Sequence, residues 1–429
     1  RNRKMTQYVI VKERKGLSLI MVAILIYIIY LMVPIVPAYL PQAAKYLVYV
    51  ISLSGAVAGA VMYERDEMVR IFSRLVLIAF FTVLQFFGKW NGHVDFFSYF
   101  LQSMLFWIGL FYLPQLCKIN QNEILSLGKI VFLLMTVTMV TTIAGNIANP
   151  NASRLLATAN NSIKYEKKNI GGYEFVYGMA ILLPYSIYHY KKRSGMIRVL
   201  SFVSTFLIVA VCVFTEYTIA ITICLFVVLI EILRRIKSKT LFFLSLGLVV
   251  VVFLLTRNII AYFLLSIQKV SVEKGLYSIA ERIDVIRDFI LGNSLSGDGQ
   301  SRSIRYAMSW EAFLKSPIIG NIGGSEVLGG HSELLDILGG TGVVGFGLFG
   351  LLIYQHFINL KSLIHVKQFW PCVESLLIFI TIAGTNTVLS SAFLGACLLC
   401  GPAIVFSSDD EQSEESERAA GNRCRYIRE

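Results

Sequence analysis

The stretch LGGHSELLDILGGTGVVGFGLFGLLIY, residues 328–354, places one histidine directly before a long apolar run. His331 follows a pair of glycines and precedes Ser332 and Glu333. Apolar runs of about 17–25 residues recur along the whole chain, and a transmembrane α-helix needs such a length. The stretch therefore predicts a membrane helix with an ionisable ring at its start, as one span among many.

The composition of the whole chain agrees with this prediction. Of its 429 residues, 56% are hydrophobic and only 15% are charged, with a mean hydropathy of +0.66. A soluble protein of this size needs more polar surface to cover its core. The alternating pattern of a membrane β-barrel is absent. The sequence therefore predicts an all-α polytopic membrane protein with about twelve transmembrane helices.

Twelve apolar runs are the expected spans. They are residues 17–36, 43–62, 72–88, 97–116, 128–147, 173–190, 199–215, 217–233, 240–256, 334–355, 370–385 and 388–406. Two hairpins are very short, one between the seventh and eighth spans and one between the last two. Without either of them, ten spans would remain with the same outer loops.

Lysine and arginine predict the orientation. With the N-terminus inside, 25 of the 39 basic residues lie on the cytoplasmic side, as the positive-inside rule requires of short loops. Both termini are then cytoplasmic. The net charge of +12 is mostly a topology signal, and we expect no nucleic-acid partner.

This orientation divides the chain into regions. Residues 1–256 carry spans one to nine and a basic third outer loop at 148–172, and residues 257–333 form one long helical outer loop. Residues 334–406 carry spans ten to twelve. Residues 407–429 are polar and charged and are expected to be a solvated cytoplasmic tail.

The long outer loop, between spans nine and ten, contains three features of interest. Its start, residues 258–270, is amphipathic and is expected to lie at the membrane interface. Arg302 and Arg305 are three residues apart, so they share one face of an expected helix that Pro317 ends. The chain then returns to the membrane at His331, which is predicted on the outer face.

Two interpretations of His331 are open. A helix N-terminus offers free backbone N–H groups and a positive dipole end, which attract anions and favour a neutral imidazole that can accept a proton. Basic residues near such a helix end suit a phosphate-bearing substrate. In the alternative interpretation, His331 is an interfacial residue that only caps or solvates the helix.

Several function classes lack their sequence signals. No P-loop, Rossmann glycine fingerprint, HExxH or GxSxG motif occurs. The only adjacent aspartates, Asp409 and Asp410, lie in the expected tail, so no outer metal cradle for a nucleotide-sugar is predicted. The spans carry almost no buried charge, whereas ion-coupled transporters keep ionisable groups near the membrane midplane. Because the motifs named above are absent, we expect neither a metal nor another cofactor.

Two motifs in the region from residue 302 to residue 350 share the spacing of a known family. The matching positions are Arg302, Tyr306, Pro317, Gly320, His331, Ser332, Leu335, Gly342 and Gly345. In these motifs, and in having a long outer loop between the ninth and tenth spans, the chain resembles the superfamily of O-antigen polymerases and O-antigen ligases. These are bacterial surface-polysaccharide enzymes.

The resemblance implies a glycosyltransferase at the outer face of the bacterial cytoplasmic (inner) membrane. Its donor would be an undecaprenyl-diphosphate-linked oligosaccharide, without nucleotide-sugar or metal. His331 would accept the proton of the acceptor hydroxyl, while Arg302, Arg305 and Arg154 of the third outer loop would hold the leaving diphosphate. Further substrate contacts are expected from Arg282, Arg287, Lys168 and Tyr306.

The motifs leave more than one activity open. The favoured one is a polymerase that joins lipid-linked repeat units of an O-antigen, capsule or exopolysaccharide, with an acceptor glycan, membrane lipid, a flippase and a chain-length regulator as partners. A ligase that transfers the glycan to lipid A–core is the alternative. A further alternative is a different class of protein, a lipid-linked oligosaccharide flippase or transporter. For a shared diphosphate site, Arg154 must face residues 302–331 across a basic outer pocket that opens sideways to lipid.

Overall fold

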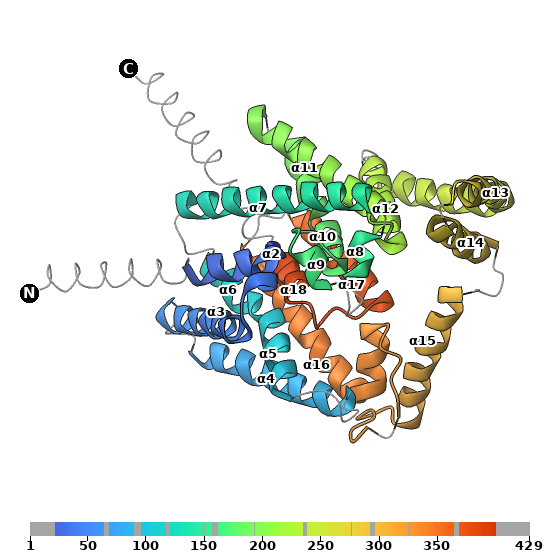
Figure 1. The fold of residues 1–429 in the computed structure, drawn as a ribbon. Coiled ribbons are helices and arrows are strands. Elements are labelled where there is room, and N and C mark those ends of the chain that lie inside the picture. Colours follow the sequence, from blue (N-terminus) through green and yellow to red (C-terminus); the bar gives the residue numbers. More distant parts are fainter. Residues whose placement is uncertain are drawn as a thin grey trace, which may run out of the picture.

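A computed structural model describes most of the chain (Figure 1). The described residues are 22–63, 68–89, 96–116, 121–149, 151–156, 162–192, 194–234, 238–275, 277–291, 297–324, 326–363 and 369–399. Within these ranges all regular secondary structure is helical and no strand occurs, so the all-α prediction is confirmed there. The expected tail at 407–429 lies outside the described residues.

The helices follow the apolar runs closely. In the first half they are the segment Val22–Met32, α2 (Ile35–Tyr39), α3 (Gln42–Tyr63), α4 (Met68–Lys89), α5 (Phe96–Trp107), α6 (Gly109–Leu116), α7 (Gln121–Ala148), α8 (Ala152–Leu155) and α9 (Ser162–Glu166). In the second half they are α10 (Tyr173–Lys192), α11 (Gly195–Phe214), α12 (Thr218–Leu233), α13 (Lys239–Glu273), α14 (Tyr277–Leu291), α15 (Gly297–Lys315), α16 (Glu333–Leu363), α17 (Phe369–Thr385) and α18 (Ala392–Leu399).

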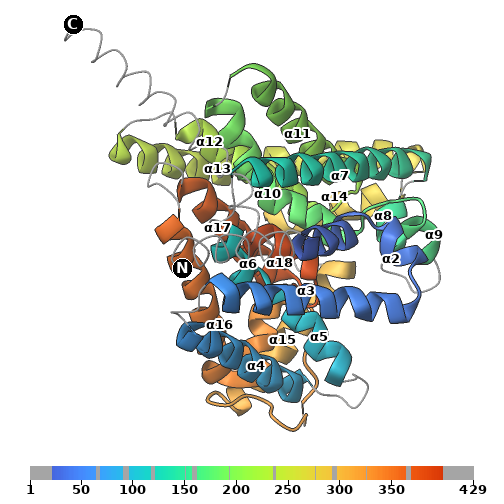
Figure 2. The same cartoon turned by 90° about the vertical axis from the view of Figure 1, so that its left-hand side faces the viewer.

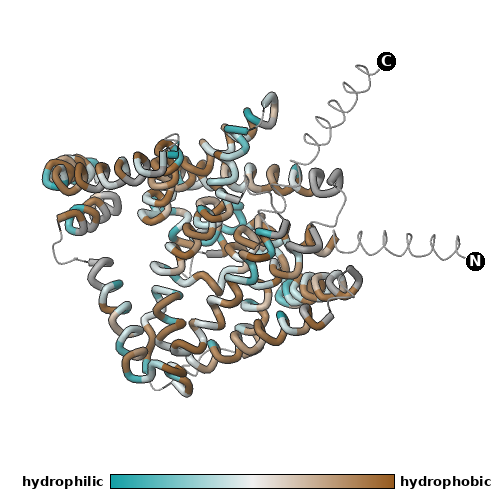
Figure 3. The backbone as a smooth tube through the Cα atoms, turned by 180° about the vertical axis from the view of Figure 1, so that it is seen from behind, coloured by the Kyte–Doolittle hydropathy of each residue, from teal (hydrophilic) through white to brown (hydrophobic). Residues whose placement is uncertain are grey.

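Four helices among the described residues are long and apolar enough to cross a membrane. They contain Ile71–Lys89, Leu127–Ala148, Val251–Glu273 and Glu333–Lys361. Several shorter apolar helices accompany them, and hydrophobic residues extend along the helices throughout the described chain (Figure 3). These features support a helical membrane protein, while the total of twelve spans stays a prediction.

The region after the ninth expected span differs from the prediction. An end near residue 256 and a separate interfacial helix at 258–270 were expected, but α13 continues without a break from Lys239 to Glu273. No glycine or proline interrupts the chain between Thr256 and Val270, so nothing ends the helix there. Its 35 residues correspond to about 52 Å, which exceeds the roughly 30 Å hydrocarbon core of a bilayer.

Helix α10 lies near the middle of the molecule. Figures 1 and 2 both show it beside α18, with α7 and α11 above and α4 below. It packs against α11, α12, α17 and α18, and its residues from Phe175 to Tyr185 are buried. The start of α10 is thereby held at the centre of one end of the bundle.

Ion pairs identify the two ends of the bundle. At one end, Lys89 at the end of α4 pairs with Glu333 at the start of α16. At the other end, Glu231 of α12 pairs with Lys191 of α10 and with Arg234, which also reaches Glu374 of α17. The C-terminal ends of α10 and α12 and the start of α17 therefore share this second end. The N-termini of α10 and α12 consequently lie at the opposite end, which carries Glu333.

A turn inserts into a break in α16. Gly342 has φ 63° and ψ −163°, which interrupts the helical backbone. The freed N–H groups of Val343 and Val344 donate to the carbonyl oxygens of Pro317 (2.9 Å) and Ile318 (3.2 Å). In return, the Asn321 N–H donates to the Gly339 carbonyl at 2.9 Å. The turn after α15 therefore replaces helical hydrogen bonds of α16.

Gly342→Ala is expected to destabilise the protein by about 1–3 kcal/mol. Only glycine adopts this backbone conformation readily, and an added Cβ would collide with the Ile318 carbonyl. The measurement is thermal unfolding of the purified protein in detergent. Gly347→Ala, in the same helix with open space around its Cα, is the matched control. Equal melting temperatures for the two variants would contradict the structural role of Gly342 in the break of α16.

Candidate functional site

The start of α16 is built by a short capping sequence. The Ser332 side chain accepts a hydrogen bond from the Leu335 N–H at 3.3 Å, which identifies Ser332 as the N-cap. Glu333 and Asp336 occupy the first turn, where carboxylates suit the positive end of the helix dipole. His331 directly precedes the cap and is partly buried. The histidine therefore lies at a helix N-terminus, as its sequence position predicts.

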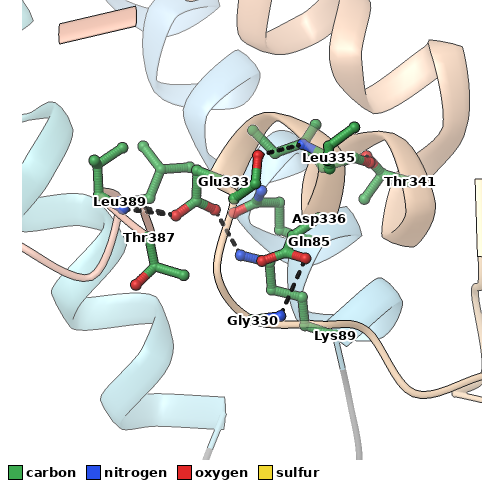
Figure 4. A network of polar contacts seen from close by, with 12 residues as sticks. Gln85, Lys89, Gly330, Glu333, Leu335, Asp336, Thr341, Thr387 and Leu389 are labelled. Carbon is green, nitrogen blue, oxygen red and sulfur yellow. Dashed lines mark hydrogen bonds and ion pairs between the residues drawn. The ribbon is translucent and has the colours of Figure 1, made fainter. Parts of the chain in front are cut away.

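Glu333 connects three parts of the fold (Figure 4). One carboxylate oxygen accepts from the Lys89 ammonium at 2.5 Å, and the other accepts from the backbone N–H groups of Val388 (2.9 Å) and Leu389 (3.1 Å). The Glu333 N–H donates to the Asn386 carbonyl at 3.1 Å. Since Glu333 is 1% exposed, this network fixes the residue two positions after His331.

Asp336 holds the turn on the other side of His331. One of its carboxylate oxygens accepts from the Ser309 hydroxyl at 2.5 Å and from the Gly330 N–H at 3.2 Å. The Ser309 oxygen in turn accepts the Gly329 N–H at 2.9 Å. A Cβ at Gly329 would collide with the backbone of α15, so this glycine admits a neighbouring helix.

Helix α15 carries Arg302 and Tyr306 toward the same end of the bundle. The Tyr306 hydroxyl donates to the Thr385 carbonyl at 3.2 Å, which ties α15 to the end of α17. Arg302, one turn earlier on the same helix, is partly buried. Arg305 is exposed. The two arginines of the expected helix face thus differ in their surroundings.

Arg154 approaches from the third outer loop. Its guanidinium donates to the Glu216 carbonyl at 2.7 Å and lies 5.4 Å from the centre of the Tyr217 ring. The Tyr217 hydroxyl donates to the Ser153 carbonyl at 3.1 Å. These contacts fasten the short helix α8 to the turn between α11 and α12.

Tyr173, Tyr177 and Tyr217 form a tyrosine cluster beside Arg154. The ring centroids are 4.9 Å apart for Tyr173 and Tyr177, 5.9 Å for Tyr177 and Tyr217, and 6.3 Å for Tyr173 and Tyr217. Arg154 contacts the cluster at Tyr217. The third outer loop therefore reaches these aromatic rings through Arg154.

The tyrosine cluster is also connected to the start of α16. The Tyr173 hydroxyl donates to the Thr387 carbonyl at 2.6 Å, and the Asn386 side-chain amide donates to the Tyr177 hydroxyl at 3.5 Å. The same segment, residues 385–389, receives the Glu333 contacts. Arg154, the helix α15 that carries Arg302, and the residues that hold His331 are thereby joined through one network at one end of the bundle.

Other expected contact residues lie elsewhere. Arg287 pairs with Asp284 at 2.5 Å and donates to the Gln268 side chain at 3.0 Å, within the hairpin of α13 and α14. Arg282 lies in α14, and its side chain is outside the described part of the chain. Lys168 lines a cavity beside α7 whose described lining contains no member of the tyrosine cluster.

Sequence reasoning missed Lys89, Glu333, Asp336 and the tyrosine cluster. A carboxylate in the first helical turn is a recognisable capping signal, and it could have singled out Glu333. Its partner Lys89 is 244 residues away, so no local pattern reveals the pair.

Within the described ranges, no three His, Cys, Asp or Glu side chains gather into a group that could hold a metal ion. The site combines cations, phenols, amides and one histidine with two buried carboxylates, Glu333 and Asp336, which are held by Lys89 and by hydrogen bonds. Such an arrangement can bind an anion and place a proton acceptor near it. Neither a protein-family model nor a curated protein matches the chain.

Proposed function

We propose that the protein is a glycosyltransferase of the bacterial cytoplasmic membrane that joins polyprenyl-diphosphate-linked glycan units at the outer face. The observation that carries the proposal is one network of contacts. Arg154 contacts the tyrosine cluster, and the cluster is hydrogen-bonded to residues 385–389, which also contact Glu333 of α16 and Tyr306, one turn after Arg302 on α15. Two guanidinium groups from distant segments suit a diphosphate, because each can donate two parallel hydrogen bonds to phosphate oxygens.

The proposed reaction is a single displacement. His331 accepts the proton of an acceptor hydroxyl as its oxygen forms a bond to the anomeric carbon of the donor. The bond between that carbon and the diphosphate oxygen breaks, and its electron pair leaves with the diphosphate. Arg302 and Arg154 neutralise the charge that develops there. A base contributes roughly 10²–10⁴-fold, so positioning supplies much of the remaining acceleration.

The tyrosine cluster supplies surfaces for sugar rings in this proposal. Tyr173 and Tyr217 are partly exposed, whereas Tyr177 is buried. An aromatic face offers apolar contact area, and a phenol offers a polar edge. Tyr173 and Tyr217 would therefore contact the glycan, and Tyr177 would support them from below.

The test is a reaction with defined components. Purified protein in detergent is incubated with a synthetic undecaprenyl-diphosphate repeat unit, and the products are separated by size. A ladder of longer lipid-linked glycans is expected from a polymerase. Product that appears only when lipid A–core is added indicates the ligase. Movement of the intact donor across proteoliposomes without a new glycosidic bond would contradict glycosyl transfer altogether.

Arg302→Lys is expected to reduce the rate of this reaction by at least about tenfold. Lysine keeps the positive charge but loses the planar donor fork, and a hydrogen bond to a charged group is worth about 1.5–3 kcal/mol. The rate is measured with the synthetic donor. Arg257→Lys, an exposed position on α13, is the matched control. Unchanged turnover by the Arg302 variant would show that Arg302 contributes only its positive charge and no specific hydrogen-bond geometry.

A further inference from the structure

A cavity of about 400 Å³ opens beside α7, at the boundary of the third outer loop. One wall is the last part of α7, where small side chains leave room, and the other wall comes from α9 and the residues after it. The described lining consists of Thr141, Ala144, Gly145, Ala148, Asn149, Lys164, Tyr165, Lys168 and Ile170. A volume of this size can hold a small molecule or a lipid headgroup.

The chemistry of the cavity selects an anion. Lys164 and Lys168 are four residues apart, and both are exposed. None of the described lining residues is a carboxylate. Tyr165 is 5% exposed, and its hydroxyl oxygen accepts a hydrogen bond from the Asn149 side-chain amide, which leaves the phenolic proton to donate elsewhere. Two ammonium groups and one phenol can thus surround a phosphate.

The surface that leads to the cavity is apolar. Leu133, Val137, Val140 and Ala144 are exposed at helical spacing along one side of α7. They belong to Leu127–Ala148, one of the segments long and apolar enough to span a membrane. Because the row ends at the cavity, a molecule with acyl chains on the row would bring its headgroup to the lysines.

We propose that this cavity binds the phosphate headgroup of a glycerophospholipid whose acyl chains lie along α7. The lysines complement the charge of a phosphate, and the adjoining apolar row favours a lipid over a free anion. The site is separate from the proposed transfer site, since Arg154 of the same loop points to Tyr217 and Glu216. The proposed lipid site does not depend on the proposed glycosyl transfer.

The test is native mass spectrometry of the full chain with added phosphatidylglycerol. In the double variant Lys164→Gln/Lys168→Gln, lipid retention is expected to fall by roughly tenfold or more, because both headgroup charges are lost. Lys167→Gln is the matched control, since the Lys167 ammonium lies over the Tyr39 ring at 4.9 Å, outside the cavity lining. Its retention is expected to equal that of the unmodified chain.

A second variant removes space and keeps the charge. Ala148→Phe fills the cavity from α7 and is also expected to displace the lipid. Equal retention by all variants would overturn the proposal, as would displacement of the lipid by millimolar inorganic phosphate. A role of the lysines limited to the negative end of the α7 dipole predicts a lower melting temperature with unchanged lipid retention, and that result would also overturn it.

Discussion

His331→Ala is expected to lower glycan formation by about 10²–10⁴-fold, which is the contribution of a positioned base. The protein itself is expected to remain folded, because the contacts of Glu333 and Asp336 that hold the start of α16 stay in place. Glu333 binds Lys89 and the backbone of residues 388 and 389, and Asp336 binds Ser309 and Gly330. The measurement combines the rate with synthetic donor and the thermal unfolding curve.

The control for this experiment separates catalysis from helix capping. His331→Asn keeps a polar side chain in front of the Ser332 cap but cannot act as an efficient base. If His331 transfers the proton, the asparagine variant is as inactive as the alanine variant. If His331 only solvates the helix end, asparagine restores activity, and long glycans from either variant would disprove the assigned role.

Glu333→Ala is expected to destabilise the protein by about 3 kcal/mol, the lower end of the cost of breaking a buried ion pair, because Glu333 is buried while Lys89 is 24% exposed. The change leaves the Lys89 ammonium and two backbone N–H groups without their acceptor. It also releases the segment that carries the Tyr173 contact, so activity is expected to fall with stability. Thermal or denaturant unfolding in detergent provides the measurement.

An exposed ion pair provides the comparison. Lys315 and Glu326 are 2.7 Å apart, with 60% and 37% of their side chains exposed. Glu326→Ala is expected to cost less than about 1 kcal/mol, because solvent screens such pairs. The double variant Lys89→Met/Glu333→Leu should be less destabilised than Glu333→Ala, since no buried charge remains unpaired. Equal losses for Glu333→Ala and Glu326→Ala would refute the structural role of Glu333.

Local sequence signals predicted much of the helical framework. Helix α15 ends at Lys315, two residues before Pro317, and α16 begins at Glu333 after the Ser332 cap. Both boundaries follow from residues within one turn of the helix end. The helix end was harder to predict after the ninth expected span, because α13 continues through Arg257 and Asn258, two residue types that a helix tolerates.

The candidate site was less accessible to such reasoning. The spacing of Arg302 and Tyr306 indicated a shared helix face, but it could not indicate that Tyr306 bonds to the end of α17. Tertiary packing alone joins Tyr173, Tyr177 and Tyr217, and each reads locally as an aromatic residue near a span end. Pairings across many helices leave no periodic pattern in the chain.

The turn that enters α16 at Gly342 has a consequence for biosynthesis. Inside a bilayer, an unpaired backbone N–H costs several kcal/mol. The carbonyl groups of Pro317 and Ile318 precede Val343 and Val344 in the chain, so they leave the ribosome before the groups that need them. In the final structure, these two N–H groups of α16 therefore depend on acceptors in a turn that is synthesised before the helix itself.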